Sequence, residues 1–385
     1  MSQMRKAFYL GLVGLAMFEI LDVYFIMPMP GSQRIDSLSV AYFLYSHRWI
    51  FRAGFALVIA AGIRGIFQEG GKWLPTFAVV ATFAVVWFLN FQMTAERMFR
   101  QPAKLVLKTR KESSVGEDSL IIGIELGGEA KAYPVRFLVY HHQVQDSIGG
   151  IPIIVTYCSV CRTGRVFKPI VAGRLEKFRL VGMDHFNAMF EDASTHSWWR
   201  QATGEAVIGP SRGSTLPEID ARQFLLREWF KLHLSSLVMQ PDEASKAEYD
   251  PKGKFERGES TGRLTRTEFA SWNDNSWVVG IRIGSVSKAY DWNRLKAQRV
   301  VNDRIGNVPV VLALAADQES FASFERPDDG WIFTINGDSL SANGRSFDFS
   351  GKDLAEPTQH LKYVISHQEY WHSWRAFHPN TLRGQ

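Results

Sequence analysis

The chain is short of cysteine, with two in 385 residues, at positions 158 and 161. Two cysteines form at most one bridge, which excludes a small scaffold held together by disulfides. Charged residues make up only 22%, and the formal net charge is +5. Because this excess is mild and no basic stripe interleaved with aromatic residues accompanies it, we expect no nucleic-acid partner. Stability must therefore come from buried apolar surface.

Several common functional motifs are missing as well. The run GIELGG does not supply the Gly-x-Gly-x-x-Gly turn of a dinucleotide site, and the chain has no phosphate loop, nucleophile elbow or HExxH. The segment CSVCR lacks the histidine that covalent haem attachment requires after the second cysteine.

Apolar residues crowd into the first 95 positions. Residues Trp73 to Ala95 carry no charge, Ala7 to Met29 carry only Glu19 and Asp22, and Tyr42 to Phe67 have an uncharged centre. About 20 apolar residues cross a bilayer as a helix. We therefore predict a transmembrane anchor of three helices over residues 1–95, in a multi-pass membrane protein whose partner is the lipid bilayer.

Polar residues within these spans indicate how the helices pair. Glu19 and Asp22 lie on one helical face and are expected to pair with Arg52 or His47, either as a polar seam or as a proton or ligand site. The basic residues that follow the third span favour a cytoplasmic C-terminal region; they are Arg97, Arg100, Lys104, Lys108, Arg110 and Lys111.

The rest of the chain matches itself at an offset of 157 residues. LIIGIELGGEAKAYP from Leu120 aligns with WVVGIRIGSVSKAYD from Trp277, and QDSIGGIPIIV aligns with NDRIGNVPVVL. Short apolar strands separated by turns dominate both copies, and helical periodicity is limited to residues 221–237 and 367–377. We predict an α+β fold in which a β-rich module is duplicated behind the anchor. Its parts are a first module at 105–240 that carries the cysteines, a linker at 241–263 and a second, degenerate copy at 264–385.

Both cysteines lie where the two copies differ. Cys158 and Cys161 in TYCSVCRTGRVF face Ala315 and Gln318 of the second copy, and His141 also has no histidine partner there. A disulfide across so short a ring stabilises little, at roughly 2 kcal/mol in the loop-entropy model. Such spacing suits thiol–disulfide exchange, in which one thiolate attacks a substrate disulfide and the other resolves the mixed species.

This pattern leaves three hypotheses open. In the first, the protein is a membrane-anchored thiol oxidoreductase with a redox partner protein, in which Cys158 or Cys161 is the nucleophile and His141 assists proton transfer. Arg162, Arg165 or a histidine would lower the pKa of the attacking thiol. In the second, the cysteines bind zinc or copper, and the remaining ligands come from a set of three side chains. These are His141, His185 and, for copper, Met183. In the third, the protein is a non-enzymatic scaffold and the cysteines are incidental.

The stretch AYPVRFLVYHHQVQDSIGGIPIIVTYCSVCRTGRVF from Ala132, together with SWWRQATGEAVIGP from Ser197, resembles the family of domains of unknown function DUF3179. The resemblance covers most of residues 105–385, and its pattern falls on His141, Asp146, Cys158 and Cys161. Selenoprotein members of the family imply redox chemistry at the cysteines. Export signals in the family imply that the two modules are extracytoplasmic, which disagrees with the count of basic residues.

Overall fold

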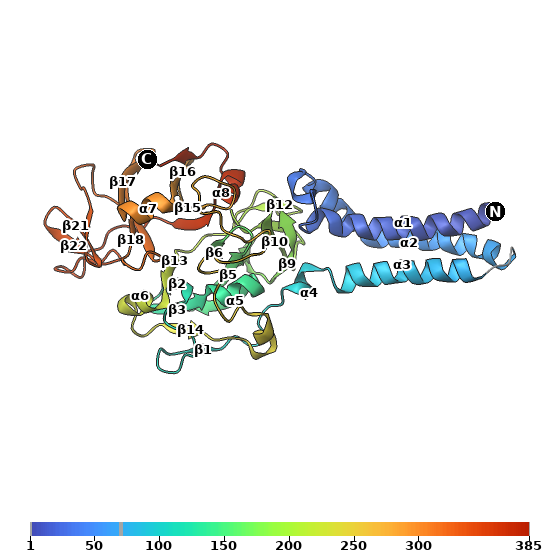
Figure 1. Ribbon diagram of the computed structural model, residues 1–385, viewed down its shortest axis with the longest axis horizontal. Helices are drawn as coiled ribbons and strands as arrows, with labels where there is room; N and C mark the ends of the chain where they lie inside the picture. Colours follow the sequence, from blue (N-terminus) through green and yellow to red (C-terminus); the bar gives the residue numbers. More distant parts are fainter. Residues whose placement is uncertain (1, 69–71, 385) are drawn as a thin grey trace. The chain divides into compact units, whose positions relative to one another are not determined.

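A computed structural model of the chain describes residues 2–68 and 72–384, and Figure 1 shows how its elements follow one another. Helix accounts for 30% and strand for 31% of the chain, which agrees with a mixed class. The chain divides into two compact units, each assembled from three segments. Unit 1 comprises Met1–Arg100, Lys177–Arg200 and Glu205–Ser214, and unit 2 comprises Gln101–Glu176, Gln201–Gly204 and Thr215–Gln385.

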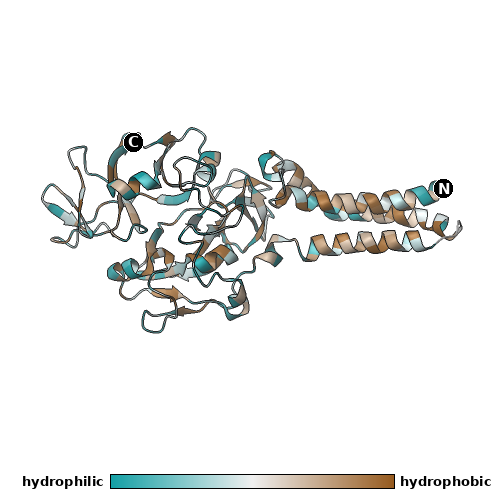
Figure 2. Ribbon diagram, viewed as in Figure 1, coloured by the Kyte–Doolittle hydropathy of each residue, from teal (hydrophilic) through white to brown (hydrophobic). Residues whose placement is uncertain are grey.

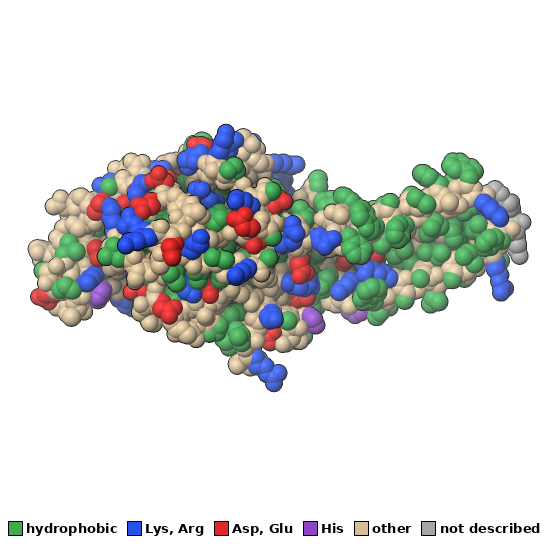
Figure 3. Space-filling view, turned by 90° about the horizontal axis from the view of Figure 1, so that it is seen from below, with side chains coloured by type: hydrophobic (Ala, Val, Ile, Leu, Met, Phe, Trp, Pro, Cys, Tyr) green, Lys and Arg blue, Asp and Glu red, His purple; other side chains and the backbone are tan. Residues whose placement is uncertain are grey.

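Unit 1 contains three long apolar helices, α1 (Gln3–Ile26), α2 (Leu38–Gln68) and α3 (Trp73–Phe91), which are largely brown in the hydropathy colouring of Figure 2. Each is long and apolar enough to cross a membrane. Many of their large apolar side chains are exposed, including Leu57 at 72% and Trp73 at 76%, and Figure 3 shows such side chains covering the helices. The prediction of three apolar helices of spanning length is confirmed.

A polar network joins these three helices through one side chain from each. Arg52 donates from Nε to Glu19 Oε1 at 2.7 Å and from Nη2 to Asn90 Oδ1 at 2.6 Å, and Asn90 Nδ2 donates to Glu19 Oε2 at 2.8 Å. Glu19 is 1% exposed. Buried charges are tolerated in an apolar bundle when they are paired, so the expected Glu19–Arg52 pair fixes how α1 and α2 face each other.

A small sheet completes unit 1, in the strand order β12-β11-β10-β9. Trp198 and Met189 of this sheet pack against Tyr42 and Ala41 of α2. At Gly182 in β9, a Cβ atom would lie 2.3 Å from the carbonyl oxygen of Ile26, so glycine allows the close approach of this strand to the end of α1. The elements are β9 (Phe178–Asp184), β10 (Asn187–Asp192), β11 (Trp198–Arg200) and β12 (Ala206–Ile208), with η1 (Ser32–Arg34) and α4 (Ala95–Met98).

Unit 2 has a five-stranded sheet in the order β1-β14-β3-β2-β13. β2 and β3 form an antiparallel hairpin, β13 pairs antiparallel with β2, and β14 pairs parallel with β3. The elements are β1 (Leu107–Lys108), β2 (Leu120–Leu126), β3 (Glu129–Pro134), β13 (Arg222–Leu225), β14 (Leu237–Met239), α5 (Val135–His141) after β3, and α6 (Leu226–Leu232) after β13.

A second sheet of unit 2 has the order β23-β15-β16-β24. β15 and β16 form an antiparallel hairpin, β23 pairs antiparallel with β15, and β24 pairs parallel with β16. The elements are β15 (Trp277–Ile283), β16 (Val286–Asp291), β23 (Ser366–Tyr370), β24 (Leu382–Arg383), α7 (Trp292–Gln298) after β16, and α8 (Trp371–Phe377) after β23.

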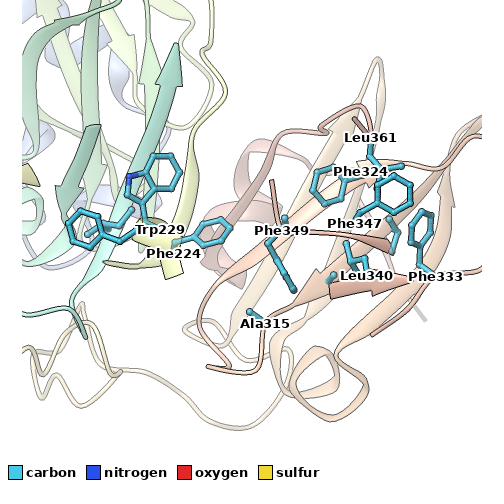
Figure 4. Packing of buried hydrophobic residues seen from close by; sticks show 14 of the residues in the cluster. Phe224, Trp229, Ala315, Phe324, Phe333, Leu340, Phe347, Phe349 and Leu361 are labelled. Atoms are coloured by element: carbon cyan, nitrogen blue, oxygen red, sulfur yellow. The ribbon is translucent and has the colours of Figure 1, made fainter. Parts of the chain in front are cut away.

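Three small sheets and one hairpin complete unit 2, in the orders β4-β5-β6, β17-β18-β19, β20-β21-β22 and β7-β8. One apolar cluster takes Phe224 and Trp229 from the first part of the unit and Phe324, Phe347 and other side chains from the second (Figure 4). The elements are β4 (Gln143–Ile148), β5 (Ile151–Cys158), β6 (Thr163–Phe167), β7 (Ile170–Val171), β8 (Arg174–Leu175), η2 (Glu243–Glu248), β17 (Val300–Ile305), β18 (Val308–Leu314), β19 (Phe321–Glu325), β20 (Thr334–Asn336), β21 (Ser339–Ala342) and β22 (Arg345–Phe347).

The helices predicted at 221–237 and 367–377 are shorter in the structure. In each segment a strand comes first and the helix, α6 or α8, occupies only seven residues. α5 and α7, also of seven residues, were not predicted. Two turns of helix are too few for hydrophobic periodicity to separate from an apolar strand, which explains both errors.

Candidate functional site

The two cysteines lie in the turn that connects β5 to β6. Cys158 is the last residue of β5 and pairs in register with Thr163, the first residue of β6. β5 is an apolar, β-branched strand in which Ile153 and Val155 are completely buried, so its end is held firmly in the core. The Cys158–Cys161 turn is therefore a tight loop on a rigid hairpin.

The sulfur atoms of Cys158 and Cys161 lie 2.8 Å apart and are not joined by a disulfide. The backbone N–H of Cys161 donates to the sulfur of Cys158 at 3.3 Å. Both side chains are 0% exposed. A disulfide bond is about 2.05 Å long, so a small movement of either side chain would bring the sulfurs to bonding distance.

Arg162 follows the second cysteine and is also completely buried. Its guanidinium donates to the carbonyl oxygens of Phe255 and Glu256, both at 2.7 Å, and to Gln368 Oε1 at 3.2 Å. The guanidinium carbon lies 3.6 Å from the centre of the Trp277 ring. These contacts compensate the loss of water around a permanent charge. The backbone of Arg162 is left-handed, with φ of 55°, an uncommon conformation for a residue other than glycine.

The two neighbouring histidines differ in their surroundings. His141 Nε2 lies 2.6 Å from the hydroxyl oxygen of Tyr249, and the proton-transfer role expected of His141 remains a prediction. His142 ends α5 in a left-handed conformation, and its Nδ1 donates to the carbonyl oxygen of Tyr157 at 2.8 Å. Burial lowers the pKa of His142 to about 4. His142 is thus a neutral residue that positions the end of β5.

Residues 102–381, which include this entire site, match a family model described as a protein of unknown function, DUF3179. The chain belongs to this family. The resemblance inferred from the segments at Ala132 and Ser197 is therefore confirmed. No curated protein and no solved structure gives a significant match.

The metal hypothesis requires further ligands beside the two cysteines. Within residues 2–68 and 72–384, no group of three or more His, Cys, Asp or Glu side chains is placed to hold a metal ion. His185 and Met183 belong to unit 1, whereas both cysteines belong to unit 2. The ring of His185 is bonded through Nδ1 to Asp184 at 2.7 Å, and this pairing raises the pKa of His185.

The sequence did not predict the residues that contact the cysteine turn of this DUF3179 chain from distant parts of the sequence. The backbone N–H of Tyr370 donates to the carbonyl oxygen of Cys161 at 2.8 Å, and His372 Nε2 donates to the carbonyl oxygen of Val160 at 3.1 Å. Phe255 belongs to the segment predicted as a linker, and its ring packs on Tyr157 with centroids 6.0 Å apart. Nothing in the spacing of the sequence indicates these contacts, because they join positions about 90 or more residues apart.

Proposed function

We propose that the protein is a membrane-anchored thiol–disulfide redox protein in which Cys158 attacks and Cys161 resolves. The observation that carries this assignment is the backbone hydrogen bond from the Cys161 N–H to the sulfur of Cys158, at 3.3 Å. An N–H donor aimed at this sulfur stabilises a negative charge on Cys158. The thiolate is the reactive form of cysteine.

The reaction proceeds in two balanced steps. The Cys158 thiolate attacks one sulfur of a substrate disulfide, the substrate S–S bond breaks, and the second substrate sulfur leaves as a thiolate that takes a proton from water. Cys161 then loses its proton and attacks the sulfur of Cys158, which releases the first substrate sulfur as a thiolate. The substrate gains two electrons, and Cys158 and Cys161 become a disulfide. The 2.8 Å separation of the sulfurs favours the second step.

Arg162 contributes to this site by holding the cysteine turn in place. Its backbone continues directly from Cys161, and its guanidinium is anchored at both ends of its fork to backbone carbonyl groups. The bidentate grip holds the end of the turn in one conformation, and it places a permanent positive charge in the buried surroundings of the thiols.

A redox titration of the full-length protein in detergent micelles tests this proposal. The protein is equilibrated in glutathione buffers of graded potential, trapped by alkylation and weighed by mass spectrometry. We expect a two-electron transition between dithiol and disulfide. We also expect the Cys161→Ser variant to accumulate a mixed disulfide with glutathione at Cys158, and the matched Cys158→Ser variant to accumulate much less. Cysteines that stay reduced in strongly oxidising buffer would refute the proposal.

We further propose that residues 105–240 and 264–385 are two copies of one module, joined by residues 241–263. Leu120 pairs with Leu225 in the first sheet as Trp277 pairs with Tyr370 in the second. Three contacts also recur at offsets of 157 or 145 residues. They are the ion pairs Lys131–Asp146 and Lys288–Asp303, the bonds from Tyr133 and Tyr290 to the same aspartates, and the indoles of Trp229 and Trp374 packed over Gly123 and Gly280. An experimental structure with a different register in the two sheets would contradict this proposal.

The location of the protein is a related proposal. We propose that α1, α2 and α3 cross the membrane and that unit 2 is extracytoplasmic, because dithiol–disulfide chemistry persists in oxidising compartments. The basic residues after α3 favour the opposite orientation.

A further inference from the structure

The thiols of Cys158 and Cys161 are completely buried, so a substrate disulfide cannot reach them directly. Thiol–disulfide exchange requires the attacking sulfur to meet a substrate sulfur along the axis of the S–S bond that breaks. Cys158 and Cys161 are both 0% exposed, so a substrate disulfide reaches neither sulfur in this conformation. The residues that cover the turn therefore decide when it reacts.

Residues 368–372, from the end of β23 and the start of α8, lie against the turn. Tyr370 N–H donates to the carbonyl oxygen of Cys161, and His372 Nε2 donates to that of Val160. Burial lowers the pKa of His372, which keeps its ring neutral, so the bond to Val160 requires the proton on Nε2. Both bonds end on backbone oxygens of the turn, so they constrain the loop that carries the sulfurs.

A second segment lies against the same turn. Phe255 and Glu256 accept the two short bonds of Arg162, and Gln368 accepts the third. The Glu256 carboxylate is in turn held by Arg136, at 2.9 Å from its Nη2. Two segments far apart in sequence thus meet at one arginine, which follows directly on Cys161.

We infer that these two segments form a cover, defined here as residues 255–256 and 368–372, which must open locally before Cys158 can react. The inference rests on the proposed redox function, since it assigns the control of access to that site. β23 is an edge strand of its sheet, paired there with β15, but all five of its residues are buried. Opening therefore breaks buried contacts, and we expect the open state to be rare.

The chain offers a clean measurement because it has only two cysteines. Reduced full-length protein in detergent micelles is treated with N-ethylmaleimide, and the number of labels is followed by mass spectrometry. We expect the wild type to be labelled at least about 100-fold more slowly than the same protein in denaturant. We expect His372→Ala, which removes the bond to Val160, to be labelled about 10-fold faster than the wild type.

Two further variants separate opening from damage to the fold. His372→Gln keeps an N–H donor near the Val160 oxygen and should restore slow labelling. His360→Ala is the matched control, because His360 is an exposed histidine of the same half, and its rate should equal that of the wild type. Labelling of His372→Ala should depend only weakly on urea below the unfolding transition, as expected of a local opening.

The outcomes also separate this inference from the redox proposal. Equal labelling rates in wild type and His372→Ala, or a urea dependence as steep as that of global unfolding, would overturn the cover, even if the cysteines titrate as a redox pair. Cysteines that label faster in His372→Ala but never oxidise would refute the redox proposal and retain the cover.

Discussion

Replacement of Arg162 by methionine should destabilise unit 2 strongly. The substitution keeps a long side chain but removes three hydrogen bonds and the charge over the Trp277 ring. It leaves the carbonyl oxygens of Phe255 and Glu256 without the guanidinium. A bond to a charged group contributes about 1.5–3 kcal/mol, and a buried carbonyl oxygen left without a donor costs about 1–3 kcal/mol. We expect a loss of about 3–5 kcal/mol, a large part of the stability of an ordinary domain.

Urea unfolding of the full-length protein in detergent micelles, followed by tryptophan fluorescence, measures this loss. Arg174→Met is the matched control, because Arg174 is an exposed arginine in the β7–β8 hairpin of the same unit, and it should change the free energy of unfolding by less than about 0.5 kcal/mol. A loss below about 1 kcal/mol in Arg162→Met would mean that the buried fork does not hold the turn, and the reasoning would fail.

Two further predictions concern pH and orientation. Burial lowers the pKa of His142 to about 4 from about 6.5 in an unfolded chain. Between these two pH values the unfolded state binds one more proton than the folded state. The free energy of unfolding therefore falls by at most about 3 kcal/mol as the pH drops through this window. His142→Gln should remove that part of the pH dependence in urea unfolding at pH 7 and pH 4.5, and an unchanged pH dependence would contradict the assignment. A phosphatase reporter that needs disulfides should be active when fused after Gly384 and inactive after Lys72, between α2 and α3, whereas the reverse pattern would place unit 2 in the cytoplasm.

Much of the chain's organisation could be predicted from sequence because it depends on local patterns. The three long helices follow from uncharged runs, as the segment from Trp73 illustrates. The strand pairs follow from short apolar runs and from the glycine turns at Gly149 and Gly306, both of which have positive φ. The candidate cysteine site, which remains a prediction, comes from alignment of the two halves, in which Ala315 and Gln318 face Cys158 and Cys161.

The surroundings of the site could not be predicted because they are contacts between distant segments. The segment around Phe255 is polar and rich in glycine, which is typical of a linker, yet its backbone oxygens bind Arg162. Backbone groups carry no residue signature, so composition gives no sign of this role. His185 is a candidate ligand because of its nearness in sequence, and this role remains a prediction; its ring is bonded through Nδ1 to Asp184. Spacing along the chain predicts ligands only where both lie on one regular element.

The two halves differ in a way that accounts for the cover. If they are copies, Ala315, Gln318 and Glu319 occupy the places of Cys158, Cys161 and Arg162, so the second half has no thiol chemistry of its own. Glu319 lies 3.7 Å from Lys296, within the second half. That half instead supplies the Tyr370 N–H and the His372 ring to the turn of the first. Under the proposed cover, this half acts through two hydrogen bonds to backbone oxygens of the turn that carries the thiols. We therefore expect substitution of Cys158 or Cys161 to abolish thiol–disulfide exchange, and substitution of His372 to change only the rate at which reagents reach the thiols.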